Sequence, residues 1–284
     1  MKKILAQSSL LISLLLLGTT LFSIAYCSYD SSVANLLYKR ENEEFDVSLA
    51  KIKSLDEFKS VIRSEVNRKN LYSFEIAALI DDRVRKKFHH GVAIIKPCEN
   101  WFSYFSSKLI TASGLNGGVL KPALLPEDIV RSAGAVCSQQ AIVFQELVRD
   151  FQMEYGSVRF NVPGHKHLAS GTKIEGKWYY FDPHLEAVYN SMKPPLLKHI
   201  IEGNKEVLNK LYGPESGSVF SMTLHYSVMP WVEGAKDNLI ELTEVNQHPE
   251  PVLASYHFFS KLISGWGWLF FLLLSISLNF SKKR

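Results

Sequence analysis

The chain has 284 residues, which allows one or two domains with a sizeable core, and its 3 cysteines are too few for a disulfide framework. Charged residues make up 21% and hydrophobic residues 46%, an ordinary globular mixture made more apolar by segments at both ends. The formal net charge is only +4, and no long basic run is flanked by aromatic residues, so we expect no nucleic-acid partner.

Residues 1–27 begin with two lysines and continue as an apolar run from Ile4 to Tyr26. A positive start followed by an apolar run predicts either a cleaved signal peptide or a retained N-terminal membrane anchor. The small residues at Ser23–Ala25 suit a signal peptidase, so both alternatives stay open.

Residues 28–69 form a helical N-terminal region in our interpretation. Helical apolar spacing covers Leu55–Val66 and then Tyr72–Phe88. His89 and His90 invite a metal interpretation, but adjacent residues on a helix face apart, and no partner cluster has metal-ligand spacing. We therefore expect this pair to be a solvated helix end, and we expect no metal site.

The segment from Gly134 to Asp182 contains most of the chemistry. After the segment G-A-V-C-S-Q-Q-A-I-V-F-Q-E-L begins, apolar residues at Ala141, Phe144, Val148 and Phe151 recur at spacings of three and four, which predicts a helix. Cys137 lies at its start, where unpaired backbone N–H groups and the positive end of the dipole favour a thiolate.

A β-hairpin follows, with predicted strands Lys166–Ile174 and Lys177–Phe181 joined by the turn Glu175-Gly176. A two-residue loop pairs Ile174 with Lys177, and counting back places Ala169 opposite Asp182. This register decides which side chains share a face.

With that register, His167 is the diagonal neighbour of Asp182 on the same face, about 7–8 Å away between Cα atoms. Their side chains can bridge that distance. His165 shares the face but lies four residues out of register, about 13 Å along the strand, and is the weaker candidate.

A cysteine at a helix start, a strand histidine and a carboxylate on the next strand form a nucleophilic constellation. The histidine takes the thiol proton, the carboxylate fixes the imidazole tautomer, and the thiolate attacks a carbonyl carbon. The sequence therefore predicts Cys137, His167 and Asp182 as catalytic residues.

The order G-x-x-C, apolar helix, His, then G-K-W-x-x-x-D-P resembles the transglutaminase-like superfamily of papain-type cysteine enzymes. The resemblance implies an α+β papain-like domain over residues 70–190, with N-terminal helices and the cysteine helix packed on an antiparallel sheet. It also implies that Cys137 is the nucleophile, His167 the base and Asp182 the orienting residue.

Two features of the sequence depart from that family. Ser138 stands where many members have an aromatic residue, directly after the cysteine. Ala169, Ser170 and Gly171 stand in the strand after the histidine, where many members carry a polar or acidic residue. The Cys137 backbone N–H supplies one oxyanion donor, and the candidates for the second are Gln139, Asn100 and Trp101. These departures keep open an alternative, a catalytically inactive binding or scaffold module in envelope assembly.

Residues 191–260 are expected to contain a helix, short strands and a linker. Pro194-Pro195 opens an amphipathic helix at Leu196–Leu211, and Val219–Val228 alternates as a strand does. The acidic and polar residues 233–250 indicate a spacer.

Residues 261–281 form the predicted transmembrane helix. The charge-free run 262–280, at about 1.5 Å per residue, gives a helix of about 28 Å, close to the thickness of a bilayer core. Trp266 and Trp268 lie at one end and Lys282-Lys283-Arg284 follow the other. Positive residues at both termini favour the cytosolic side, so we expect the globular domain to be extracytoplasmic.

The resulting prediction is a membrane-anchored, outward-facing cysteine enzyme that acts on an amide or ester through a thioester intermediate. Hydrolysis, as in a protease or amidase, and acyl transfer share every step before the acceptor enters. We expect a protein or peptide substrate and no metal or organic cofactor. Cys98 is free or pairs with Cys27; pairing with Cys137 would exclude catalysis.

Overall fold

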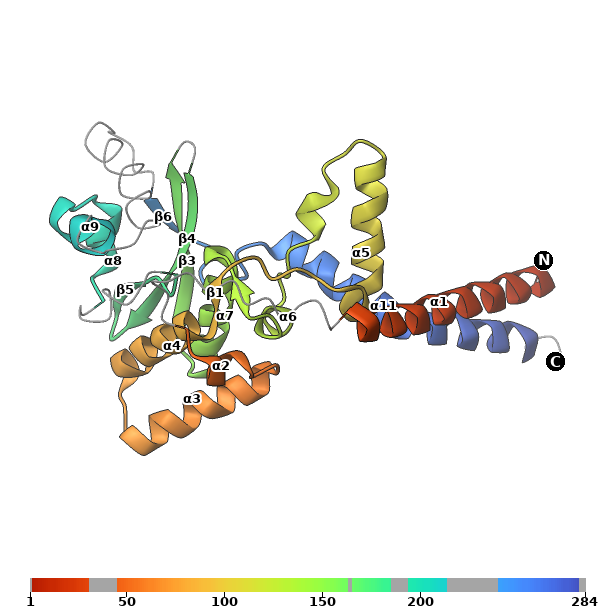
Figure 1. Ribbon diagram of the computed structural model, residues 1–284, viewed down its shortest axis with the longest axis horizontal. Coiled ribbons are helices and arrows are strands. Elements are labelled where there is room, and N and C mark those ends of the chain that lie inside the picture. Colours follow the sequence, from red (N-terminus) through yellow and green to blue (C-terminus); the bar gives the residue numbers. More distant parts are fainter. Residues whose placement is uncertain (1, 31–44, 163–164, 185–193, 214–239, 281–284) are drawn as a thin grey trace. The chain divides into compact units, whose positions relative to one another are not determined.

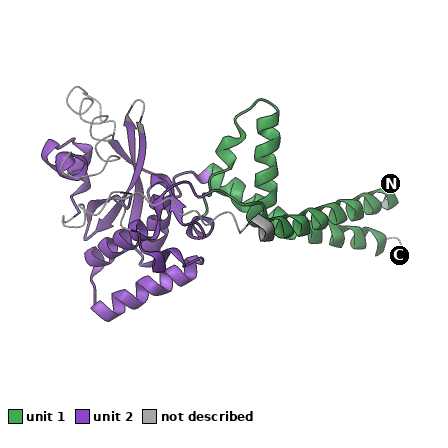
Figure 2. Ribbon diagram, in the orientation of Figure 1, with its two compact units in different colours: residues 1–37, 94–125, 252–284 green, residues 38–93, 126–251 purple. Residues whose placement is uncertain are grey.

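A computed structural model describes residues 2–30, 45–162, 165–184, 194–213 and 240–280. Contacts divide the chain into two compact units (Figure 2). Unit 1 comprises residues 1–37, 94–125 and 252–284, and unit 2 comprises residues 38–93 and 126–251. Residues 94–125 of the predicted 70–190 core therefore group with the two ends of the chain, and the domain boundaries drawn from the sequence stay a prediction.

Unit 1 is helical. Its elements are α1 (Lys2–Asp30), α5 (Pro97–Ala112), the 3₁₀ helix η1 (Gly117–Leu120) and α11 (Pro251–Phe280). Figure 1 shows α1 and α11 as long helices that run side by side. Both are long and apolar enough to cross a membrane, over Lys3–Tyr26 and Pro251–Phe280, by length and composition alone.

Small polar side chains join α1 to α11. Ser13 Oγ donates to the carbonyl of Trp268 at 2.7 Å, and Ser275 Oγ donates to the carbonyl of Ala6 at 2.9 Å. Ala6 lies earlier on α1 than Ser13, but its partner Ser275 lies later on α11 than Trp268. The two helices are therefore antiparallel. Helices that associate in lipid use contacts of this kind, because small side chains let backbones approach.

Helix α5, which the sequence analysis did not predict, is bonded to α11. Asn100 Nδ2 donates to Ser260 Oγ at 2.7 Å, and Trp101 Nε1 donates to the carbonyl of Ser264 at 3.0 Å. Both side chains are buried, so these bonds satisfy donors that would otherwise lose water.

Unit 2 contains the remaining described elements, which combine helices with an antiparallel sheet, as the predicted α+β class requires. They are α2 (Val47–Ala50), α3 (Leu55–Lys69), α4 (Ser73–Lys87), β1 (His89–His90), α6 (Pro126–Val130), β2 (Gly134–Ala135), α7 (Cys137–Asp150), β3 (Glu154–Val162), β4 (His165–Ile174), β5 (Lys177–Phe181), α8 (Leu197–Ile201), α9 (Lys205–Tyr212) and β6 (Ile240–Thr243).

The main sheet has the order β5-β4-β3-β6, with antiparallel neighbours throughout. In the β4–β5 hairpin Ile174 pairs with Lys177, and the ladder continues to Ser170 opposite Phe181. Glu175 and Gly176 both have positive φ, 50° and 77°, as a type I′ turn requires. The predicted hairpin and its register are confirmed.

Helix α7 packs its apolar face against the sheet. Of the predicted face residues, Ala141, Phe144 and Val148 are fully buried, and Phe151, the C-cap residue, is partly buried. The Phe144 ring stacks on the Phe181 ring of β5 with a centroid separation of 5.2 Å. This contact fixes the cysteine helix directly over the strand that leads to Asp182.

A buried amide adds a polar link between α7 and the sheet. Gln145 Nε2 lies 3.3 Å from Ser157 Oγ on β3 and 3.2 Å from Ser170 Oγ on β4. Ser157 and Ser170 are register partners, so one side chain ties the helix to both central strands.

The other face of the sheet is covered by α8 and α9, which Figure 1 shows on the side away from α7. The prediction of a single helix over Leu196–Leu211 is wrong, because the helix is interrupted at Gly203. Gly203 has a φ of 67°, and Asn204 then caps α9 by accepting from the Val207 N–H at 3.1 Å. The break starts a second helix in a new direction.

The predicted spacer over residues 233–250 contains a strand, β6, whose Ile240 pairs with Phe160 of β3. The C-terminal helix α11 begins at Pro251, well before the predicted start at residue 261. The strand predicted at Val219–Val228 lies outside the described residues.

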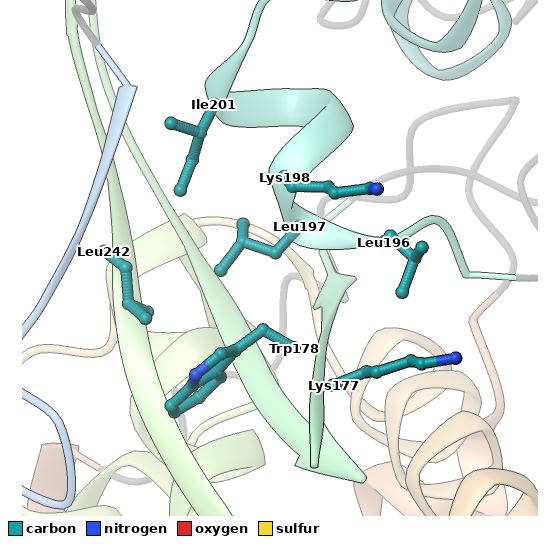
Figure 3. A pocket seen from close by; sticks show the side chains of 7 residues that line it. All are labelled: Lys177, Trp178, Leu196, Leu197, Lys198, Ile201 and Leu242. Atoms are coloured by element: carbon teal, nitrogen blue, oxygen red, sulfur yellow. The ribbon is translucent and has the colours of Figure 1, made fainter. Parts of the chain in front are cut away.

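A cavity of about 410 Å³ remains between α8 and the sheet. Figure 3 shows its lining, in which Trp178, Leu197 and Leu242 gather at one side and the Lys177 and Lys198 side chains extend away from Leu242. None of the predicted catalytic residues lines it.

We expect Phe144→Ala to destabilise the full-length protein by about 3–5 kcal/mol, because the change leaves a cavity between α7 and β5. Denaturant unfolding in detergent measures this free energy. Val47→Ala, at an exposed position, is the control and should change it little. Equal stability of the two variants would contradict the packing described for α7.

Candidate active site

Helix α7 places Cys137 at its first turn, with Val136 as the N-cap residue. The first N–H groups of a helix have no intrahelical acceptor, so they and the dipole favour negative charge on the sulfur. Cys137 is a free thiol and is partly exposed, whereas Cys98 is disulfide-bonded. The pairing of Cys98 with Cys137 that would exclude catalysis is therefore absent.

The hairpin brings His167 of β4 to Asp182, the residue after β5. His167 Nε2 lies 2.6 Å from Asp182 Oδ2, and both side chains are buried. The diagonal contact follows from the confirmed register, in which Asp182 continues β5 beyond Phe181. The side chain of His165, the weaker candidate, lies outside the described ones.

The imidazole of His167 acts on the Cys137 thiol, and each group shifts the pKa of the other. Burial and, more weakly, the charge of Asp182 raise the pKa of the Cys137 thiol, but the polar and positively charged imidazole and the Leu168 backbone outweigh them. The net pKa of Cys137 falls below its usual 9.0.

The pKa of the His167 imidazole moves in the opposite direction, upward. Burial lowers the pKa of His167, but the charge of Asp182, its hydrogen bond and the contact with Cys137 raise it to about 10. A lowered thiol pKa beside a raised imidazole pKa favours the thiolate–imidazolium pair over the neutral thiol–imidazole pair. The site can therefore present a nucleophile and a general acid together.

Asp182 accepts further hydrogen bonds from residues that the sequence analysis did not single out. Tyr212 Oη lies 2.9 Å and Tyr180 Oη 3.2 Å from its Oδ2, and the His184 N–H lies 3.2 Å from its Oδ1. Tyr212 comes from α9, outside the predicted core. No local pattern around Tyr212 indicates this contact.

His89 and His90 are not a solvated helix end, so that prediction is wrong. Helix α4 ends at Lys87, and the two histidines form β1, which pairs in parallel with Gly134–Ala135 just before the cysteine helix. The His90 ring lies edge-on to the His184 ring, with centroids 4.1 Å apart. Parallel pairing with β2 thus brings this segment to the site.

The three candidates for a second oxyanion donor are engaged elsewhere. Gln139 binds the backbone of Ala93 in both directions, accepting from its N–H and donating to its carbonyl at 2.8 Å each. Asn100 and Trp101 belong to unit 1 and donate to α11. The backbone N–H of Cys137 remains the donor that the helix start provides.

Within the described ranges, no group of three or more His, Cys, Asp or Glu side chains is arranged to hold a metal ion.

We compared the chain with protein families, curated proteins and solved structures. No family model matches the chain, and no curated protein matches it by sequence. Among solved structures, it is similar to a protein described as a "putative cysteine protease" from Cytophaga hutchinsonii, with 15% identity and a TM-score of 0.28. The match covers 54% of this chain and 47% of that one, so less than half of the neighbour is represented. A likeness of this size does not establish a shared fold.

We expect His167→Ala to slow alkylation of Cys137 by iodoacetamide at pH 6.5 by at least about tenfold, because the thiol pKa rises when burial raises it and His167 no longer lowers it. Rates measured from pH 5 to 9 give the pKa directly. Cys137→Ala identifies background labelling, and His199→Ala removes a histidine on α8 as a matched control. Equal rates for wild type and His167→Ala would contradict the thiolate–imidazolium pair.

Proposed function

We propose that this chain is a membrane-anchored cysteine enzyme of transglutaminase-like type. It acts outside the cytosol on an amide or ester carbonyl of a protein or peptide. Cys137 is its nucleophile, His167 its acid–base residue and Asp182 the residue that orients the imidazole. The observation that carries the proposal is the 2.6 Å contact between His167 and Asp182 beside a thiol whose pKa is lowered by His167.

The reaction follows from these charges. The Cys137 thiolate attacks the carbonyl carbon, and the backbone N–H of Cys137 stabilises the oxygen that becomes negative. The imidazolium of His167 gives its proton to the leaving amine or alcohol, and a thioester remains on Cys137. His167 then accepts a proton from the second nucleophile, which releases the acyl group and restores the thiolate.

Hydrolysis and acyl transfer differ only in that second nucleophile. Water gives a carboxylic acid, and a primary amine gives a new amide. Both acceptors need a proton removed as they attack, and the same imidazole serves in either case. The site thus supports both reactions until an acceptor is identified.

Membrane attachment is supported by both long apolar helices and by the hydrogen bonds between them. We infer that α1 is a retained anchor. A cleaved signal peptide would leave α11 without the acceptor carbonyl of Ala6 and the donor hydroxyl of Ser13. The lysines at both chain ends favour a topology in which the middle of the chain faces outward.

An inactive scaffold remains the competing function. Ser138 in place of an aromatic residue favours it, as does the engagement of Gln139, Asn100 and Trp101 elsewhere. The two functions differ in one observable property, since only the enzyme forms a covalent acyl intermediate on Cys137.

We expect the purified full-length protein to gain the mass of one acetyl group from p-nitrophenyl acetate and then to lose it. The rate should fall about 10²–10⁴-fold in His167→Ala, the range for loss of general acid–base catalysis, and the adduct should be absent in Cys137→Ala. Faster loss of the adduct with added primary amine indicates transfer, and loss at an unchanged rate indicates hydrolysis. Wild-type protein without an adduct on Cys137 would favour the scaffold.

We also expect intact-mass measurement of the membrane-extracted protein to show a chain that retains α1. In Ala25→Leu the small residue that a signal peptidase would read is removed, and the N-terminus should not change. A wild-type mass that starts just after Ala25, restored to full length in this variant, would show that α1 is a signal peptide.

A further inference from the structure

The Asp182 carboxylate is completely buried, and its charge is therefore costly unless hydrogen-bond donors replace water. Among the described residues, Oδ2 faces three donors: His167 Nε2, Tyr212 Oη and Tyr180 Oη. Oδ1 accepts from the His184 N–H. An ionised carboxylate has about four lone-pair sites, so this set is close to saturation.

The two tyrosines reach the carboxylate from different elements. Tyr180 lies two residues before Asp182, and alternation along a strand puts both on one face. Tyr212 is the last residue of α9, and Leu208 and Leu211 of the same helix are buried in the core cluster beneath it. Both tyrosine side chains are fully buried, so each hydroxyl is held in place by packing.

The hydroxyl groups of Tyr180 and Tyr212 have distinct roles as hydrogen-bond donors. Tyr180 and Tyr212 also bond to each other, so two hydroxyl protons serve three contacts among these oxygens. The shorter contact to Asp182 is that of Tyr212, at 2.9 Å against 3.2 Å for Tyr180. Tyr212 therefore donates to the carboxylate, and Tyr180 donates chiefly to the Tyr212 oxygen. The bond from Tyr180 polarises the Tyr212 hydroxyl and makes Tyr212 a stronger donor.

We propose that Tyr212, supported by Tyr180, is a positioning residue that holds the Asp182 carboxylate in line with Nε2 of His167. This inference rests on the proposed function of Cys137, His167 and Asp182, and it adds a residue of α9 to the residues that support that function. Neither tyrosine takes part in bond making. Each acts through the carboxylate, which in turn sets the charge of the imidazole and so the thiolate content of Cys137.

Other charged groups near this network bear on its pH dependence. Burial, together with the charges of Asp182 and Asp82, raises the pKa of Asp81 on α4 to about 8, against the opposing effect of Arg85. Asp81 is therefore mostly protonated at neutral pH and loses its proton only on the alkaline side. His184 faces the carboxylate through its backbone, and its ring lies edge-on to the His90 ring. Thiol activation below pH 8 is thus dominated by Cys137, His167 and Asp182.

Replacing tyrosine by phenylalanine removes the hydroxyl and keeps the ring. The Tyr212 ring packs edge-on to the Phe160 and His167 rings, with centroids 5.9 Å and 6.3 Å away. Those contacts persist in Tyr212→Phe, so a change in the pH dependence of the thiol reports the lost hydrogen bond and not lost packing. A hydrogen bond to a buried charge is stronger than one between neutral groups.

The test is the rate of Cys137 alkylation by iodoacetamide from pH 5 to 8 in the full-length protein in detergent. In Tyr212→Phe the acid limb should move up by about 1 pH unit, which corresponds to about 1.4 kcal/mol. In Tyr180→Phe it should move by less, about half a unit by the same conversion. Tyr179→Phe is the matched control, because its side chain points to the opposite face of β5 and its ring contacts Phe74; its profile should match wild type.

Circular dichroism shows which variants are folded, and Tyr180→Phe decides the matter if Tyr212→Phe does not fold. Acid limbs that coincide with wild type, or that move to lower pH, in the folded variants would overturn the inference. If His167→Ala also leaves the rate unchanged, the proposed triad fails. If His167→Ala slows the reaction and the tyrosine variants do not shift, only the role of the tyrosines fails.

Discussion

The buried charge of Asp182 is the constraint on which the candidate site depends. No water reaches this carboxylate, so protein donors must replace hydration, and they come from β4, β5 and α9. Removing one partner of a buried pair leaves an uncompensated charge, which is strongly destabilising. Elements distant in the sequence are therefore coupled through two oxygen atoms, and correct packing of α9 affects the state of a sulfur on α7.

The three catalytic candidates differ in their access to solvent, and the difference suits the roles proposed for them. Cys137 is partly exposed at a helix start, where a substrate carbonyl can approach it. His167 and Asp182 are buried, where low polarity strengthens their mutual attraction and prevents water from competing for their hydrogen bonds. The apolar cavity beside α8 is a separate feature, because none of these three residues lines it.

The predictable part of the site was encoded locally. The turn Glu175-Gly176 fixes the hairpin register, and that register alone brings His167 to Asp182. The apolar face of α7 likewise determines where Cys137 lies. The position of Tyr212 follows instead from the helix break at Gly203, and that of the β1 histidines from parallel pairing with β2. Neither the helix break nor the parallel pairing leaves a periodic pattern in the sequence, so the positions of Tyr212 and the β1 histidines could not be predicted.

The energetics of the site favour chemistry over a purely structural role. A buried ion pair is often no more stabilising than apolar side chains of similar volume, so a scaffold gains little from burying His167 and Asp182. The chain nevertheless surrounds this pair with two tyrosine hydroxyls and places a partly exposed free thiol against it. Buried groups with shifted pKa values beside an accessible nucleophile are characteristic of active sites, where stability is given up for reactivity. The arrangement is explained most simply if the Cys137 sulfur reacts.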